Sequence, residues 1–237
     1  MTETGTALSG KPPLTVQAAV PKPASERVQD EWNKKFSEKV LPDEPDKFIV
    51  ENLHYLKEMN CKNVLDLGSG TGRDAIFLAK KGFTVTAVDF SEEGNKIARE
   101  RIERNNCTQS VSLLSDDFTK MELGTESYDC VLANKSLYYF ALDQFQGLVR
   151  KILAALRPGG IFVMRTYSIE DPQYRVGKKL EDKMYDAGDH PRRFYTKTEL
   201  QDILYNFNVI TLRKDVSTNL LGKYQVMWAV IAQKPFH

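Results

Sequence analysis

Three glycines at alternate positions, Gly68, Gly70 and Gly72, form the segment whose residue types point most directly to a chemistry. Glycine adopts positive φ and lets a ligand approach the backbone without a Cβ in the way. An apolar run precedes these glycines and an amphipathic helical pattern follows them, so the turn leads into a helix N-terminus with free N–H groups. We therefore expect a nucleotide-like ligand over Gly68–Gly72, with Ser69 beside it.

An acidic residue at the end of the next apolar run supports this expectation. Asp89 lies 21 residues after Gly68, close to the spacing at which an acid binds the hydroxyls of a ribose. A carboxylate accepts hydrogen bonds from both hydroxyls, which an amide does less well. The alternative role of a helix N-cap suits Ser91 better. We predict that Asp89 binds the ribose and that Phe90 lies against the base.

The spacing of the glycines distinguishes between classes of nucleotide ligand. A dinucleotide fingerprint that starts at Gly68 needs a glycine at position 73, which is Arg73. The pattern is instead D-x-G-x-G-x-G from Asp66, and it resembles the first motif of the class I S-adenosylmethionine-dependent methyltransferases. The segment LRPGGIFVMR is also typical of that family. The resemblance covers roughly residues 45–235 and implies S-adenosylmethionine as the cofactor; the small size and the Trp-containing first helix weakly resemble the tellurite-resistance-type and related small-molecule enzymes.

The resemblance also implies roles for residues outside the glycine turn. Asp66 and Asn134 would face the amino-acid end of the cofactor. An acid followed by Phe118 resembles the adenine-binding motif, and whether Asp116 or Asp117 is that acid stays open. The helix over 25–40 carries Trp32, which either covers the cofactor or packs on the sheet.

After the fourth predicted strand, Tyr138 and Tyr139 occupy a position where many small-molecule methyltransferases of this family have histidines or aromatic residues; they either form the wall of the site or point a hydroxyl at the substrate. The motifs [DN]-P-P-[YFW] and Pro-Cys, which amino-directed and cytosine-C5 nucleic-acid methyltransferases carry there, are absent. Residues 168–196 depart from the strand–helix alternation and are expected to recognise the acceptor, the alternative being a solvated loop. Candidate catalytic residues are Tyr139, Tyr174 and His190. Candidate substrate-binding residues are Tyr138, Tyr167, Arg193 and Tyr195.

The order of elements predicts an α/β fold. Strands are expected at 63–67, 83–89, 111–115, 126–133, 161–167, 208–212 and 225–232, with helices at 25–40, 46–58, directly after the glycines, at 91–105 and 142–156, and from Thr196. Right-handed crossovers require parallel pairing of the first five strands. We expect a seven-stranded, mostly parallel sheet with flanking helices and an antiparallel last strand.

Composition sets wider limits. Residues 1–24 are rich in Pro, Ala and Thr and are expected to be a disordered tail, which leaves one domain over 25–237. A net charge of +1 gives no bulk electrostatic case for a nucleic-acid or membrane partner, and the 3 scattered cysteines form no metal-binding pattern. We expect a cytoplasmic monomer or homodimer without a metal.

Three functions agree with these residues. The first is methyl transfer from S-adenosylmethionine to a small molecule, with the acceptor in line with the S–CH₃ bond. The second uses the same cofactor but releases methylthioadenosine, by aminocarboxypropyl transfer or by cyclisation to azetidine-2-carboxylate. The third is a non-catalytic cofactor-binding or partner-binding module.

Overall fold

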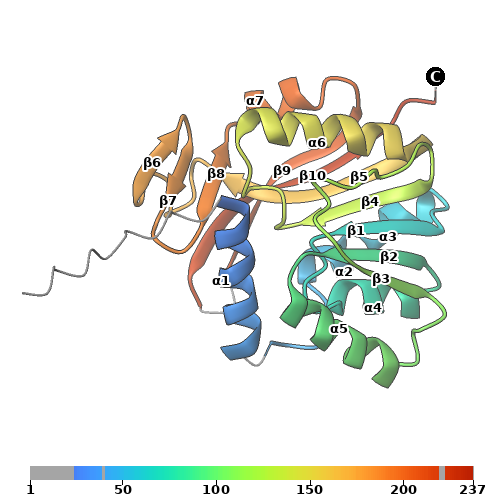
Figure 1. The fold of residues 1–237 in the computed structure, drawn as a ribbon. Helices are drawn as coiled ribbons and strands as arrows, with labels where there is room; N and C mark the ends of the chain where they lie inside the picture. Colours follow the sequence, from blue (N-terminus) through green and yellow to red (C-terminus); the bar gives the residue numbers. More distant parts are fainter. Residues whose placement is uncertain (1–23, 39–40, 219–221, 237) are drawn as a thin grey trace, which may run out of the picture.

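An open sheet lies at the centre of the computed structural model, which describes residues 24–38, 41–218 and 222–236. Its main strands lie in the order β3-β2-β1-β4-β5-β10-β9 (Figure 1). They span Asn63–Leu67 (β1), Thr84–Asp89 (β2), Val111–Ser115 (β3), Tyr128–Asn134 (β4), Leu156–Ser168 (β5), Asn208–Thr218 (β9) and Tyr224–Gln233 (β10). β1 to β5 are parallel, while β10 is antiparallel to both β5 and β9. The predicted mostly parallel sheet with an antiparallel last strand is confirmed.

The strand count differs from the prediction because the 168–196 insertion forms strands of its own. They are β6 (Lys178–Glu181), β7 (Met184–Asp186) and β8 (Pro191–Tyr195), which bring the described strands to ten. β8 joins the end of β5 in parallel, with Tyr167 opposite Phe194. β6 and β7 have only 4 and 3 residues, too few for an alternating pattern to be recognised in the sequence.

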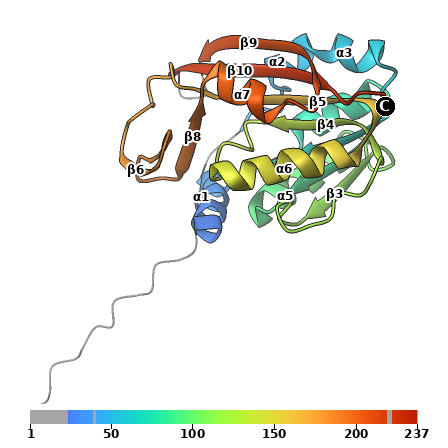
Figure 2. The same cartoon turned by 90° about the horizontal axis from the view of Figure 1, so that it is seen from above.

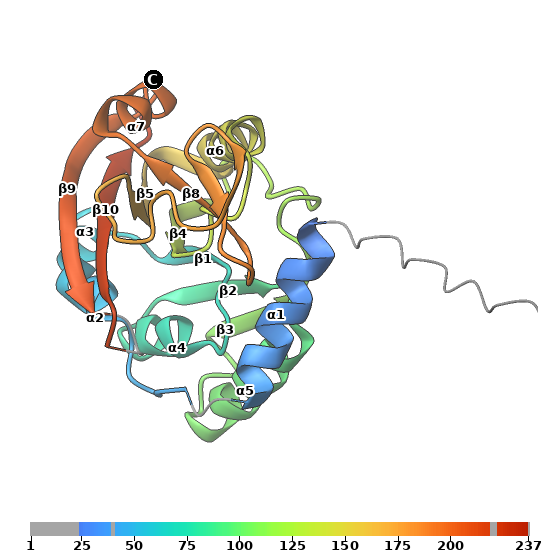
Figure 3. The same cartoon turned by 90° about the vertical axis from the view of Figure 1, so that its left-hand side faces the viewer.

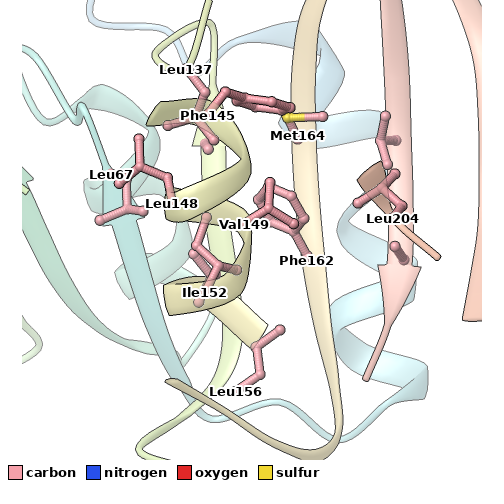
Figure 4. Close-up of a cluster of buried hydrophobic side chains, with 14 of the residues drawn as sticks. Leu67, Leu137, Phe145, Leu148, Val149, Ile152, Leu156, Phe162, Met164 and Leu204 are labelled. Carbon is pink, nitrogen blue, oxygen red and sulfur yellow. The ribbon is translucent and has the colours of Figure 1, made fainter. Parts of the chain in front are cut away.

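Helices cover both faces of the sheet (Figures 1 and 2). One face packs on α2 (Lys47–Glu51), α3 (Leu53–Glu58), α4 (Arg73–Lys80) and α5 (Glu92–Arg104). The other packs on α6 (Leu142–Ala155) and α7 (Lys197–Ile203). Neighbouring strand residues alternate between the two cores: Val131 belongs to the α6 side and Leu132 to the α4 side. Figure 4 shows Leu148, Val149 and Ile152 of α6 in the same buried cluster as Leu67 and Phe162 of the sheet.

The predicted helix over 46–58 is two short helices. Asn52 lies between α2 and α3, with φ −100° and ψ 7°, and its side chain donates a hydrogen bond to the carbonyl oxygen of Phe48 at 2.7 Å. The side chain thereby competes with the regular backbone ladder at this position. The preference for Ser91 as an N-cap is confirmed, since its side chain accepts from the backbone N–H of Gly94. Thr196 also caps a helix, in a capping box with Glu199.

The first helix, α1 (Ala24–Glu38), crosses the carboxyl edge of the strands instead of covering either face (Figures 1 and 3). Gln29 donates to the carbonyl oxygen of Phe90 at 2.6 Å, and Arg27 pairs with Asp186 of the insertion at 2.9 Å. The predicted tail lies outside the described residues except for Ala24. No helix among the described residues is long and apolar enough to cross a membrane.

Candidate functional site

A cavity of about 2110 Å³ opens at the carboxyl edge of the parallel strands, under α1 and beside the insertion. Parallel strands present their carboxyl ends at one edge, where ligands of open α/β sheets bind. The structure therefore brings together most of the residues that the sequence singles out. The predicted residues on its wall are Trp32, Gly68, Ser69, Gly70, Asp89, Phe90, Asp117, Phe118, Asn134, Tyr138, Tyr139, Tyr167 and His190.

The glycine turn is held on three sides. Gly68 has φ +78°, and a Cβ there would lie 2.4 Å from the Cβ of Ser136, so no side chain fits. The backbone N–H of Gly70 donates to Oδ2 of Asp89 at 2.8 Å. From the opposite side, the ring of Phe36 approaches to 3.3 Å of the place a Cβ would take on Gly70. The end of β2, the β4 loop and α1 thus fix one turn conformation.

Asp89 connects this turn to the next helix. Its second oxygen accepts from the backbone N–H of Ser91 at 2.8 Å, and only 6% of the residue is exposed. Burial raises the pKa of Asp89, although the backbone hydrogen bonds from Ser91 and Gly70 oppose that shift. The carboxylate is thereby oriented at the cavity wall, and its remaining lone pairs can accept from a ligand.

Asp66 lies beneath the turn, not on the wall. It is 3% exposed, and among the described residues its Oδ2 has no hydrogen-bond partner. Burial, together with the nearby carboxyls of Asp74 and Asp89, raises its pKa well above the usual value. The hydroxyls of Ser69 and Ser136 are also buried and have no hydrogen-bond partner in the part of the chain that the structure describes. Buried polar atoms without partners are rare in folded proteins, so this cluster suits a polar ligand that completes it.

The two acids after β3 are placed differently. Asp117 is on the cavity wall, where it accepts from the backbone and hydroxyl of Thr119 at 3.0 and 2.6 Å and pairs with Lys120 at 3.0 Å. Partial burial opposes its charge, but these partners outweigh burial and lower its pKa. Asp116 is exposed and is not a wall residue. The structure therefore favours Asp117 as the adenine-side acid.

A charged network that sequence reasoning missed borders the turn. Oδ2 of Asp46 lies 2.6 Å from Arg165, 3.1 Å from Arg73 and 3.5 Å from Lys135. Despite its burial, these cations lower the pKa of Asp46 to about 2, while burial and the charge of Arg165 lower the pKa of Lys135 to about 8. Asn134 joins the network by donating to Asp74 at 3.1 Å. The residues come from four separate segments, so no local motif could reveal them.

An aromatic wall closes the cavity where α1 meets the insertion. The ring of Trp32 lies 5.1 Å from that of Phe36 and 6.3 Å from those of both Tyr139 and His190. Tyr139 and His190 are themselves 5.0 Å apart. Tyr138 continues the wall, 4.4 Å from Tyr139. Groups that lie far apart in the chain thus shield this end of the cavity from water.

The protonation states of this wall limit its chemistry. Burial and the charge of Arg192 lower the pKa of His190 to about 3, so the imidazole is neutral at physiological pH. Burial raises the pKa of Tyr138, Tyr139 and Tyr167, so these phenols stay protonated. The tyrosines are therefore hydrogen-bonding groups, and His190 is too weak a base to hold a proton near pH 7.

Three insertion residues with predicted roles do not reach the cavity. Tyr174 packs edge-on against Phe194 at 5.5 Å, and Tyr195 lies in the core against Phe145 at 5.0 Å. Arg193 is 2% exposed and pairs with Glu181. Because successive strand residues point in opposite directions, Arg192 lies on the wall instead. Gly72, the N-cap of α4, where a Cβ would lie 3.2 Å from that of Ala98, is not a wall residue either.

Comparison with known proteins identifies the domain. Residues 64–160 match the family described as "Methyltransferase domain". A methyltransferase of Geobacillus sp. (strain WCH70) is 27% identical over 67% of this chain and 62% of its own length. The tRNA N(3)-cytidine methyltransferase of Gallus gallus is 25% identical over 72% of this chain and 50% of its own length. The chain thus spans between half and two thirds of these relatives.

A solved structure extends the comparison to nearly the whole fold. The 1,6-didemethyltoxoflavin-N1-methyltransferase of Burkholderia thailandensis, with bound 1,6-didemethyltoxoflavin and S-adenosylhomocysteine, aligns with a TM-score of 0.68 at 20% identity, over 93% of each chain. The class I fold is therefore confirmed, while S-adenosylmethionine, the cofactor expected from the sequence, stays a proposal for this chain. The unpaired atoms around the glycine turn fit that cofactor. Among the described residues, no cluster of histidines, cysteines and acids suits a metal ion.

Proposed function

We propose that the chain is a class I S-adenosylmethionine-dependent methyltransferase, which transfers the cofactor's methyl group to a small molecule bound in the same cavity. The observation that carries this proposal is the continuity of the cavity. One wall holds the glycine turn and Asp89, and the other holds the aromatic side chains of Trp32 and Tyr139.

The wall residues divide between parts of the cofactor. Asp89 would accept from the ribose hydroxyls, and Asp117 would accept from the adenine amine while Phe90 and Phe118 cover the ring. Asp66 lies beneath the turn and not on the wall, so it would act on the cationic amino-acid end through its charge, and that cation would in turn favour the ionised form of Asp66. When bound, the sulfonium supplies an electrophilic methyl group, so the protein has only to align a nucleophile with it.

The protonation states make alignment the main mechanism. His190 and the wall tyrosines do not act as bases near pH 7. The acceptor therefore brings a lone pair that is already available, as a neutral nitrogen or an acidic hydroxyl does. Exclusion of water by Trp32, Tyr139 and His190 strengthens the electrostatic contacts inside the cavity.

The proposal also concerns the chemical class of the methyl acceptor, which could be a nucleic acid or a small molecule. The net charge of +1 does not exclude a nucleic-acid acceptor, since one relative is a tRNA methyltransferase. A small acceptor is supported by the cover that α1 and the insertion form together, with Arg27 paired to Asp186. The Burkholderia enzyme, whose fold is similar, binds a small heterocycle. The tellurite-type subgroup and a monomeric or homodimeric state stay predictions.

Product analysis tests this function. The protein is incubated with methyl-labelled S-adenosylmethionine alone, with the small-molecule fraction of a cell extract, and with total tRNA. We expect S-adenosylhomocysteine and labelled product only with the small-molecule fraction. Label in tRNA would contradict the small acceptor, methylthioadenosine from the cofactor alone would contradict methyl transfer, and no turnover at all would favour a binding module.

Cofactor binding is tested separately at Asp89. Asp89→Asn keeps the shape but replaces an acceptor oxygen with a donor, so we expect cofactor affinity to fall about tenfold or more. Isothermal titration calorimetry measures the affinity. Glu92→Gln, an exposed acid at the start of α5, is the matched control and should bind normally. Equal affinities for the two variants would contradict the assignment.

A further inference from the structure

A second group of unpaired buried polar atoms lies in the cavity, away from the glycine turn. Gln225 of β10 and Arg192 of β8 both line the cavity. Gln225 donates to the hydroxyl of Tyr167 on β5 at 2.8 Å, and the positive charge of Arg192 partly offsets the burial that raises the pKa of that hydroxyl. The three strands thus gather polar groups at one point of the acceptor wall.

The hydrogen bonds at this point are incomplete. Gln225 is 4% exposed, and within the described part of the chain its Oε1 has no partner. Arg192 donates from both terminal nitrogens to Asp189, while its Nε has no partner there. One unused acceptor and one unused donor remain. Buried polar groups without partners are unfavourable, so a ligand that pairs with both is favoured.

The neighbouring side chains define the shape of that ligand. The ring of Tyr138 lies 4.6 Å from that of Tyr167 and 4.4 Å from that of Tyr139. The hydroxyl of Tyr139 donates to that of Tyr138 at 2.9 Å, so these phenols already use part of their hydrogen-bonding capacity on one another. Flat aromatic faces around a small polar point suit a planar ring, which stacks on them at little entropic cost.

We propose that the methyl acceptor is a planar heterocycle with an amide-like edge, recognised by Gln225 and Arg192. An N–H or O–H of that edge donates to Oε1 of Gln225, and the adjacent oxygen or ring nitrogen accepts from Nε of Arg192. The inference rests on the proposed function, since it names the class of acceptor for that site. Gln225 and Arg192 are then specificity-determining residues, which no motif in the sequence indicated.

Binding of two matched probes tests this inference. The protein is saturated with S-adenosylhomocysteine, which prevents turnover, and titrated calorimetrically with 2-quinolinone or 1-methyl-2-quinolinone. The second probe has the same ring system and carbonyl but lacks the N–H. We expect 2-quinolinone to bind about tenfold more tightly, the effect of one buried hydrogen bond with an unpaired partner.

Two variants test whether the preference for 2-quinolinone depends on the side chain of Gln225. Gln225→Met keeps the volume but removes the amide, and it should bring the preference for 2-quinolinone close to one. Gln233→Met, on the same strand but donating to Gly159 outside the cavity, should keep the preference. S-adenosylhomocysteine affinity, measured for all three proteins, reports folding and cofactor binding independently of the probes.

The outcomes separate the two proposals. Normal binding of S-adenosylhomocysteine with no preference between the probes, with no binding of either probe, or with a preference that Gln225→Met retains overturns the acceptor inference and leaves methyl transfer to its own assay. Failure of the wild-type protein to bind S-adenosylhomocysteine overturns the proposed function, and the inference with it.

Discussion

At position 68, backbone conformation and side-chain packing each require a glycine. Its φ of +78° disfavours any side chain, and Ser136 occupies the space a Cβ would need. At His190 the constraint is electrostatic, because the imidazole is buried next to Arg192 and stays neutral. Both constraints predict measurable effects of single substitutions.

Gly68→Ala should cost clearly more stability than the same change at Gly82. Gly82 also has positive φ, +91°, but a Cβ there would meet nothing within 4 Å. We expect roughly 1 kcal/mol for Gly82→Ala, from backbone conformation alone, and more than about 2 kcal/mol for Gly68→Ala, where a contact is added. Urea unfolding measures both. Equal losses would show that Ser136 moves aside easily.

His190 should make the protein less stable in mild acid. An ordinary histidine takes up a proton near pH 6.5, but folded His190 does so only near pH 3. Between these values the unfolded chain binds more protons, so the free energy of unfolding falls as pH is lowered through that window. The part due to His190 is on the order of 1–2 kcal/mol between pH 7 and pH 5.

Urea unfolding at pH 7 and pH 5 measures this dependence. His190→Gln should lose less stability between the two pH values than the wild type does. His54→Gln, at an exposed position of α3, is the control and should behave as the wild type. An unchanged pH dependence in His190→Gln would contradict the buried neutral state.

Among the helices, α1 stands apart because none of its described residues belongs to the two cores that flank the sheet. It lies across the strand ends and is held by a few side chains, among them Gln29, which donates to Phe90. Its apolar residues Trp32 and Phe36 face the cavity and the glycine turn, not the sheet core. Helix α1 therefore acts as a wall of the site.

Trp32 should report cofactor binding by its fluorescence. The chain has 2 tryptophans, and the other, Trp228, is buried in the sheet core with its N–H bonded to Tyr195. We expect cofactor addition to change the emission of the wild type and of Trp228→Phe, but not of Trp32→Phe. A response that survives in Trp32→Phe would place α1 outside the cofactor site.

At the scale of the whole molecule, a rigid sheet supports a cover made of weakly attached parts. β2, β1, β4, β5 and β10 form the inner strands and bury nearly all their apolar side chains. α1 and the β6–β7 hairpin lie outside the two cores, and β6 is largely exposed. Regions with few buried apolar contacts open most readily.

Hydrogen exchange should follow this division. We expect amides of α1 and of β6 to exchange much faster than those of β4 and β5 in the free protein. S-adenosylhomocysteine should slow exchange in α1 and in the glycine turn while leaving α7 unchanged. Peptide-resolved mass spectrometry measures these rates. Ligand-independent protection of α1 as strong as that of β4 would contradict a weakly attached cover.

The sequence by itself determined the sheet and the glycine turn, and it is the source of the proposed cofactor. These features depend on local periodicity and on residue spacing within one strand–turn–helix unit, which a single segment of chain contains completely. Asp89 and Ser91 could be assigned from their neighbours alone for the same reason. The caps at Ser91 and Thr196 are equally local.

Only the tertiary structure decided which side chains share the acceptor wall. Arg192 and Arg193 are adjacent in sequence, but successive side chains of β8 point to opposite faces. Arg192 therefore lines the cavity, while Arg193 pairs with Glu181. Gln225 meets Tyr167 because β10 pairs with β5, across 58 residues of chain. Such contacts depend on strand register and on burial, which change the surroundings of a residue without changing its local pattern.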